Sequence, residues 1–251
     1  MSPPLYLELI LTLERLAFRG WPALESRDIA GWHLRFSGGY TKRANSINAL
    51  GRDAQVDPVT LDTIEAVYRG RGLTPIWRLT PLAPPSVAGL LRVRGYRQIE
   101  HSLVQRCALG RFIADPAVAV HAQPSSLWID AFCRYSPVAP AHRDMMQRMP
   151  RAIAPPVGFA LVEQSSRPLA LAIGAVEGDH MGLFDVLVTP EARRQGWARR
   201  VTESLYAWAQ AQGARFAYLQ VVATNAAALP LYEAQGFRTV YGYEYWVPPA
   251  P

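Results

Sequence analysis

The chain has 251 residues, half of them hydrophobic, with a mean hydropathy near zero and a formal net charge of +6. These values suit a globular protein of one large or two small domains, with enough length to bury a core. Lys42 is the only lysine, so we attribute the net charge to an arginine-rich composition and look for anion sites in local clusters.

Two function classes are disfavoured by the residue usage. No block of basic residues with interleaved aromatics is present, so we expect no nucleic-acid partner. The two cysteines, Cys107 and Cys133, lack metal-ligand spacing and are too few for a disulfide framework. We therefore expect a reduced, cytoplasmic protein without a bound metal.

The first half of the chain alternates helical and strand patterns. An amphipathic helix is predicted over 5–19, where Glu8, Glu14 and Arg15 interrupt an apolar run and argue against a signal peptide or a membrane partner. Proline-rich 111–125 breaks the pattern and is interpreted as a linker. Between them, periodicity predicts strands over 31–37, 43–50, 74–80 and 97–109 and helices over 59–72 and 86–96.

The second half alternates in the same way. Helices are predicted over 127–135, 140–149, 191–213 and 226–237, and strands over 157–164, 169–178, 181–189, 216–224 and 239–247. Alternation of this kind predicts an α/β protein. Its central sheet is expected to be mixed, with parallel and antiparallel strands as in α+β folds, and flanked by helices.

A constant shift of 141 residues relates the two halves. Gly72 precedes a predicted strand and Gly95 ends the next helix, and Gly213 and Gly236 stand in the same places 141 residues later. In each half an aromatic residue and an arginine follow the second glycine. We interpret this shared register as a duplicated domain.

The segment TPEARRQGWARR, residues 189–200, stands where a predicted strand gives way to a helix. Pro190 ends the strand, and Gly196 removes a side chain that an approaching phosphate would meet. Free N–H groups and the positive end of the helix dipole favour an anion there. Arginines oppose that dipole by about 0.3–1 kcal/mol each at an exposed site. Four of them in eight residues favour a bound anion over a solvated helix start.

Two motifs in this half resemble signatures of the GNAT superfamily of N-acetyltransferases. RRQGWA after VLVTP resembles the superfamily's coenzyme A loop. NAAALPLYEAQGF resembles its second signature, in which Tyr232 follows Asn225 by seven residues and Gly-Phe ends the helix. The likeness covers about 125–247, and the whole chain is similar to a subgroup of two-domain bacterial GNAT proteins.

The resemblance implies an acetyl-CoA-dependent enzyme and assigns roles to individual residues. Strand-edge backbone groups would hold the pantetheine arm, and Tyr232 would act as general acid for the departing thiolate, because a phenol and an alkyl thiol have similar pKa values. A core aromatic on a short helix is the alternative for Tyr232. The implied cofactor-binding residues are Val186, Leu187, Val188, Arg193, Arg194, Gln195, Gly196, Trp197, Ala198, Arg199 and Asn225.

The implied reaction is direct transfer to a primary amine of a small molecule or peptide in a ternary complex. The thioester carbonyl would accept a hydrogen bond from the N–H of Val186 or Val188. The amine must lose a proton to attack, so a base is needed, and Asp185 is the first choice. The other candidates for the base are Glu177, His180 and Glu244.

Two polar clusters have two interpretations each. The tyrosines of the last predicted strand, Tyr241, Tyr243 and Tyr245, either line the acceptor pocket or alternate across a sheet. The segment GYTKRANS is either a hairpin turn or a site of acceptor recognition or domain contact. The segment holds Tyr40, Lys42, Arg43, Asn45 and Ser46 within eight residues.

The 141-residue shift also tests the first half for chemistry. The loop RRQGWA falls on RDAQVD at 52–57, Asn225 falls on Pro84, and Tyr232 falls on Leu91. The glycine of the loop, the asparagine and the tyrosine are all lost. We predict a degenerate, non-catalytic GNAT-like domain over 1–110, a linker over 111–125 and a catalytic GNAT domain over 126–251.

Two alternatives to an acetyltransferase are open. One is an acyl-CoA-binding sensor without turnover, against which the intact Tyr232 argues. The other is a structural protein without a cofactor. Acyl groups other than acetyl also fit the motif, because the loop recognises coenzyme A rather than the acyl group.

Overall fold

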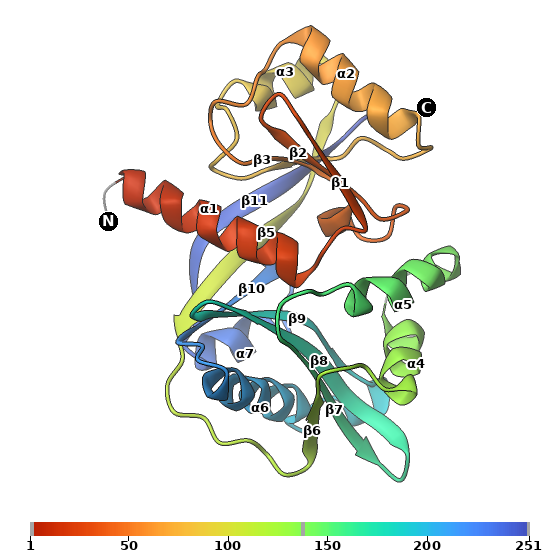
Figure 1. Cartoon of the computed structure of the whole chain (residues 1–251), viewed down its shortest axis with the longest axis vertical. Coiled ribbons are helices and arrows are strands. Elements are labelled where there is room, and N and C mark those ends of the chain that lie inside the picture. The colour runs from red at the N-terminus through yellow and green to blue at the C-terminus, as the bar shows by residue number, and fades with distance from the viewer. Residues whose placement is uncertain (1–2, 137–138, 250–251) are drawn as a thin grey trace.

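Eleven strands form one continuous mixed sheet in the computed structural model, which describes residues 3–136 and 139–249 (Figure 1). Their order across the sheet is β1-β2-β3-β4-β11-β5-β10-β9-β8-β7-β6. The strands are β1 (Glu25–Ile29), β2 (Trp32–Phe36), β3 (Ile47–Ala49), β4 (Trp77–Leu79), β5 (Arg97–Ala108), β6 (Val118–His121), β7 (Val157–Gln164), β8 (Arg167–Glu177), β9 (His180–Val188), β10 (Phe216–Val222) and β11 (Arg238–Val247). The helices are α1 (Pro3–Gly20), α2 (Pro58–Arg69), α3 (Val87–Val93), α4 (Ser126–Tyr135), α5 (Arg143–Arg151), α6 (Trp197–Ala211) and α7 (Leu229–Ala234).

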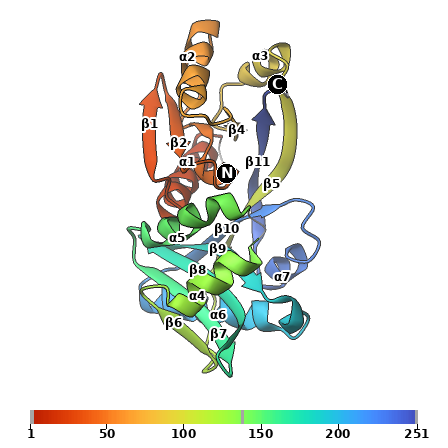
Figure 2. The ribbon, with the colours of Figure 1, turned by 90° about the vertical axis from the view of Figure 1, so that its right-hand side faces the viewer.

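Helices cover both faces of the second half's sheet (Figures 1 and 2). An apolar core lies on each face. Neighbouring residues of β7 point to different cores: Phe159 packs with α1, α4 and α5, whereas Ala160 packs with α6 and α7. Both faces are buried, which explains why these strands are nearly continuous apolar runs. A third core, around Trp32 and Trp77, fills the first half against α2 and α3.

The final strand of each half lies in the other half's part of the sheet. β5, which ends the first half, runs antiparallel to β10 from Ser102 to Ala108. β11, which ends the second half, runs antiparallel to β4 from Glu244 to Trp246, and β5 and β11 also pair with each other. The 141-residue shift places β5 on β11 and α3 on α7, so the exchange is reciprocal. The halves are therefore interlocked at the centre of the sheet.

Four elements differ most from the sequence prediction. The strand predicted over 43–50 covers only Ile47–Ala49 and follows a 3-10 helix, Lys42–Ala44. The segment 111–125, interpreted as a linker, contains edge strand β6, which pairs with β7. The pattern does not predict β1, because ESRDI is polar and exposed; Ala30 and Gly31, at φ 49° and 85°, turn it back onto β2. The helix predicted over 191–213 begins only at Trp197.

Among the helices described, none combines the length and apolarity needed to cross a membrane. In residues 3–136 and 139–249, no group of three or more His, Cys, Asp or Glu side chains is placed to hold a metal ion. Cys107 and Cys133 are both free thiols.

Candidate active site

Strands β9 and β10 pair only near their beginnings. Their parallel register ends at Leu183 and Leu219, although the strands continue to Val188 and Val222. The two strands therefore separate and open a gap in the sheet beside the second half of β9.

The backbone of β9 turns unpaired N–H groups into this gap. On the opposite, β8 side, the Thr189 N–H donates to the Leu169 carbonyl oxygen (2.9 Å). Backbone groups alternate in direction along a strand. The N–H of Leu187 therefore points to β8, while those of Val186 and Val188 point into the gap.

A groove of about 660 Å³, here called the β9–α6 groove, runs along this gap to the start of α6. Both predicted catalytic residues, Asp185 and Tyr232, line it. Gln195 does not: its side chain donates to the Glu191 carbonyl oxygen (3.0 Å) and accepts from Trp197 Nε1 (3.3 Å). The predicted cofactor residues along the groove are Val186, Leu187, Val188, Arg193, Arg194, Gly196, Trp197, Ala198, Arg199 and Asn225. Their roles stay predictions.

The loop before α6 depends on backbone conformations that few residues adopt. Gly196, the N-cap of α6, has φ 81°, and Arg194 has φ 61°. Position 196 favours glycine because residues with a side chain rarely adopt a positive φ. The space beside Gly196 is open, since a Cβ there would meet no protein atom within 4 Å. The first N–H groups of α6 lack intrahelical partners and face the same groove.

The four arginines around this loop repel one another and the helix dipole less than their number suggests. Arg199 pairs with Glu203 one turn later (2.7 Å between Nε and Oε1), and Arg200 pairs with Asp115 through two nitrogens. Carboxylates therefore offset two of the four charges, and the arginine count alone does not require a bound anion. Both remaining arginines of the loop line the groove.

Tyr232 is both a core aromatic residue and part of the groove wall, and its role as general acid stays a prediction. Its side chain is buried in the α6–α7 core, with its ring centroid 5.8 Å from that of Phe237. It also lines the β9–α6 groove. Burial, followed by the negative charge of Asp185, raises the pKa of its phenol to about 12, so the hydroxyl is protonated at neutral pH. The raised pKa also makes the phenol a weaker acid than the matched pKa values of a free phenol and an alkyl thiol predict.

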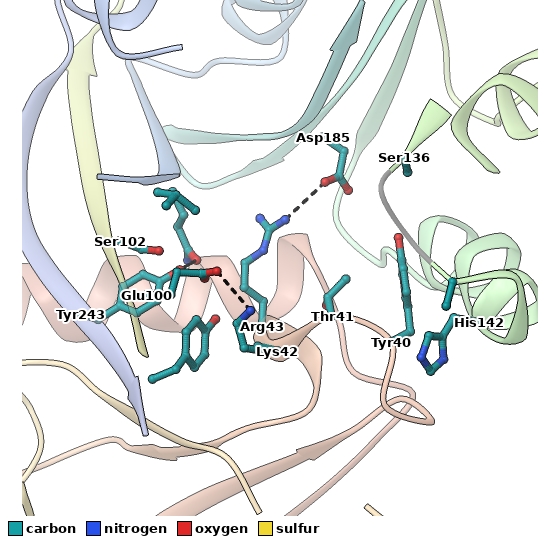
Figure 3. Close-up of a pocket in the computed structure, with 14 residues that line it drawn as sticks. Tyr40, Thr41, Lys42, Arg43, Glu100, Ser102, Ser136, His142, Asp185 and Tyr243 are labelled. Carbon is teal, nitrogen blue, oxygen red and sulfur yellow. Dashed lines mark hydrogen bonds and ion pairs between the residues drawn. The ribbon is translucent and has the colours of Figure 1, made fainter. Parts of the chain in front are cut away.

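A second cavity, here called the Arg43 pocket, has a volume of about 420 Å³ and is drawn in Figure 3. It meets the groove at Asp185 and Ser136, which line both cavities. Both halves of the chain form its wall. Its lining residues are Tyr40, Thr41, Lys42, Arg43, Glu100, Ser102, Ser136, Ala139, His142, Asp185, Gln220, Val222, Tyr243 and Tyr245.

Two β-bulges place the two carboxylates of this pocket. The β8–β9 register shifts around Asp185, and the β5–β11 register shifts around Glu100. Both residues have positive φ, 47° and 44°. Non-glycine residues rarely adopt this region, and bulges near active sites redirect side chains. Local backbone strain therefore aims both carboxylates at the pocket.

Each carboxylate meets a cation from the loop between β2 and β3. Arg43 Nη2 lies 3.3 Å from Asp185 Oδ1, and Lys42 Nζ lies 3.1 Å from Glu100 Oε2 (Figure 3). Asp185 Oδ2 has no hydrogen-bond partner among the described residues. Burial raises the pKa of Asp185 above its ordinary value, and the Arg43 charge opposes that rise.

The segment GYTKRANS divides between the two interpretations. Tyr40, Lys42 and Arg43 line the pocket, as acceptor recognition or domain contact would require. Asn45 instead braces the loop: its Oδ1 accepts from the N–H groups of residues 37 and 39, and its Nδ2 donates to the carbonyls of residues 40 and 41. Ser46 is buried beside Asn48.

The structure does not bring the other three candidate bases to either cavity. Glu177 pairs with Arg19 (2.6 Å). His180 pairs with Asp179 (2.6 Å), and burial lowers its pKa. Glu244 lies on β11 outside both linings.

Two of the three predicted tyrosines of β11 line the pocket, and the third does not. Tyr243 and Tyr245 line the Arg43 pocket, whereas the Tyr241 hydroxyl donates to Glu14 in the core. All three tyrosines belong to one core cluster, and two of them also line the pocket.

Sequence reasoning missed five polar residues of the pocket wall. No motif marks them, because exchange of β5 into the second half and the return of the chain after α4 bring them together. The polar strand sequence QIEHS at 98–102 is the one local signal. These residues are Glu100, Ser102, Ser136, His142 and Gln220.

Comparison with known proteins identifies the family of the chain. A family model described as "Probable histone acetyltransferase Rv0428c C-terminal" matches residues 9–246. The chain is 28% identical over 247 residues to the "Uncharacterized N-acetyltransferase YobR" of Bacillus subtilis, which covers 94% of this chain and 97% of that protein.

Solved structures share the fold at low identity. A GCN5-related N-acetyltransferase from Kribbella flavida superimposes with a TM-score of 0.66 at 16% identity, covering 96% of each chain. A tandem GNAT protein from the clavulanic acid biosynthesis pathway gives a TM-score of 0.62 at 10% identity, covering 96% of this chain and 89% of that one. The predicted mixed α/β fold, a mixed sheet flanked by helices, is confirmed. The division into two tandem GNAT-like domains stays a prediction. The chain thus belongs to the Rv0428c acetyltransferase family, a family of N-acetyltransferases within the GNAT superfamily.

Proposed function

We propose that this N-acetyltransferase takes acetyl-CoA in the β9–α6 groove and transfers the acetyl group to a primary amine in the Arg43 pocket. The amine belongs to a small molecule or a peptide. The proposal depends above all on the meeting of groove and pocket at Asp185 and Ser136. A donor and an acceptor bound in the two cavities are adjacent, as direct transfer in a ternary complex requires.

Three parts of the groove suit three parts of the cofactor. The free N–H groups of Val186 and Val188 support a pantetheine arm lying as an added strand. The start of α6, with Gly196 as its N-cap, supports the pyrophosphate through unpaired N–H groups and the helix dipole. Asn225 Oδ1 accepts from the Ala228 N–H (3.1 Å), which leaves its amide nitrogen for the pantetheine region.

The chain's own residues divide the proton transfers between them. Acetyl-CoA, when bound, supplies the acetyl group as a thioester. Asp185 accepts the proton that the amine loses as its nitrogen bonds to the carbonyl carbon, because Oδ2 is unpartnered and burial raises the pKa. The N–H of Val186 or Val188 donates to the carbonyl oxygen. Tyr232 gives its proton to the sulfur as the carbon–sulfur bond breaks.

We also propose different roles for the two halves. Pro84 and Leu91 occupy the first-half positions equivalent to Asn225 and Tyr232, so that half lacks the proposed chemistry. Its loop before β3 instead walls the Arg43 pocket. The proposed units are a non-catalytic 1–110, a connecting 111–125 and a catalytic 126–251, in a protein that we place in the cytoplasm.

The test of this function is the release of free coenzyme A from acetyl-CoA in the presence of a panel of amines. Tyr232→Phe should lower kcat by about 10²–10⁴-fold, the range for losing a general acid. The matched control is Tyr206→Phe, a buried tyrosine of the same core outside the groove, which should leave kcat near wild type. Binding of acetyl-CoA without release by any amine would instead support the sensor alternative.

A further inference from the structure

We propose that the acceptor is a free amino acid or a similar amino carboxylate, with Arg43 holding its carboxylate and Asp185 its amine. This inference rests on the proposed function, since it assigns the substrate class of that site. It begins from the charges of the Arg43 pocket. Lys42 and Arg43 from the first half face Glu100 and Asp185, and all four side chains are 20–34% exposed. The pocket therefore presents both signs of charge in equal number.

The Arg43–Asp185 pair is incomplete. Its one contact joins Nη2 to Oδ1 at 3.3 Å, and Asp185 Oδ2 has no partner among the described residues. Two arginine pairs of this chain show the complete, bidentate geometry: Arg78 binds Glu14 through two nitrogens and two oxygens, as Arg200 binds Asp115. Arg43 thus keeps most of its guanidinium fork for a ligand carboxylate, which such forks bind in bidentate geometry.

A ligand that carries an amine and a carboxylate on one carbon matches this arrangement. Its carboxylate can bind Arg43 while its amine reaches Asp185, where the pocket meets the groove. Thr41 Oγ1 and the Tyr245 hydroxyl, also in this wall, are buried without partners in the described structure. Buried polar atoms rarely stay unpaired, so these hydroxyls would bond the same polar ligand.

The same charges disfavour two other acceptor classes. A diamine brings no carboxylate, so it would leave the Arg43 fork unfilled. The side-chain amine of a lysine within a peptide brings no carboxylate beside it, and would leave the Arg43 fork unfilled in a partly buried site. Removing the carboxylate from the ligand should therefore lower kcat/KM more than changing the side chain of the ligand does.

The experiment compares coenzyme A release for the twenty amino acids, their amides and their decarboxylated amines. For at least one amino acid, kcat/KM should exceed that of its amide by about 10–150-fold, the worth of one charge-assisted hydrogen-bonded contact. Arg43→Met and Arg43→Lys should remove that preference, leaving amide and acid alike. Arg167→Met, an exposed residue outside both cavities, should keep it.

A binding measurement separates this inference from the proposed function. Calorimetric titration of the amino acid and its amide into wild type and Arg43→Lys needs no turnover. Tight binding of the acid, lost with the amide and in Arg43→Lys, supports the inference even if no coenzyme A is released. Release that is as fast with amides, diamines or lysine peptides as with amino acids overturns the inference and leaves the acetyltransferase intact. An absence of both binding and release with amino acids also overturns it.

Discussion

Arg43 and Asp185 lie 3.3 Å apart between Nη2 and Oδ1, although 142 residues separate them in the chain. The contact joins the two halves at the meeting of groove and pocket. The half without catalytic motifs therefore sets the charge environment of the proposed base in the other half.

Asp185→Asn removes the proposed base without changing the size of the side chain. We expect kcat/KM to fall by about 10²–10⁴-fold, with the stabilisation by acetyl-CoA retained because the groove is unchanged. Steady-state kinetics and melting curves check the two parts. A variant within threefold of wild type would remove Asp185 from the mechanism.

The pH dependence follows from the sign of the Asp185 shift. Burial raises its pKa, so the carboxylate loses activity by protonation at a higher pH than an ordinary aspartate. The ratio of wild-type to Asp185→Asn rates should fall toward one as pH drops through that raised pKa. Taking the ratio at each pH cancels the ionisation of the amine itself. A ratio independent of pH would contradict the assignment.

Asn45→Ala should loosen the loop that carries Lys42 and Arg43, because Asn45 makes four hydrogen bonds to that loop's backbone. We expect a loss of about 1–3 kcal/mol in unfolding free energy and a higher KM for the acceptor, with acetyl-CoA affinity unchanged. Asp57→Ala is the matched control. It removes the N-cap of α2, at a similar cost of about 1 kcal/mol, far from the pocket. If the KM for the acceptor is equal in the two variants, the loop does not contribute to acceptor binding.

The buried Glu14–Arg78 pair should be needed where α1 crosses the exchanged strands. Arg78 binds both oxygens of Glu14, and its guanidinium lies 3.7 Å from the ring centroid of the pocket residue Tyr243. Arg78→Met leaves a buried carboxylate uncompensated and should cost about 3–5 kcal/mol in urea unfolding. The double variant with Glu14→Leu should recover much of that loss. Single and double variants of equal stability would show that the pair is not coupled.

Local sequence predicts the groove far better than the pocket. The segments around Gly196 and Tyr232 are each contiguous, and their spacing specifies a strand, a turn and a helix in a fixed order. Glu100 reaches the pocket only because β5 pairs across to β10 and because a bulge turns Glu100 inward. Neither strand partners nor bulges follow from hydrophobic periodicity, since they depend on segments distant in sequence.

The same limit explains the errors at the level of elements. The strand β1 has no apolar face to reveal it, and it is held in place by its turn and its pairing with β2. The repeat at 141 residues was visible from glycine positions, but the reciprocal exchange of β5 and β11 was not. A duplication of sequence does not specify which copy a strand pairs with.

The most direct test of the account is the rise in Tm that saturating acetyl-CoA causes in wild type, Gly196→Asp and Gly213→Asp. At about 100 times the dissociation constant, wild type should gain about 2.7 kcal/mol, a rise of about 5–10 °C. Gly213→Asp places the same side chain at a similar positive φ, 92°, beyond the far end of α6, and should keep the rise. Gly196→Asp should abolish it, because a carboxylate then occupies the proposed pyrophosphate site. A wild-type protein that acetyl-CoA does not stabilise, or an equal rise in both variants, would contradict cofactor binding in the β9–α6 groove.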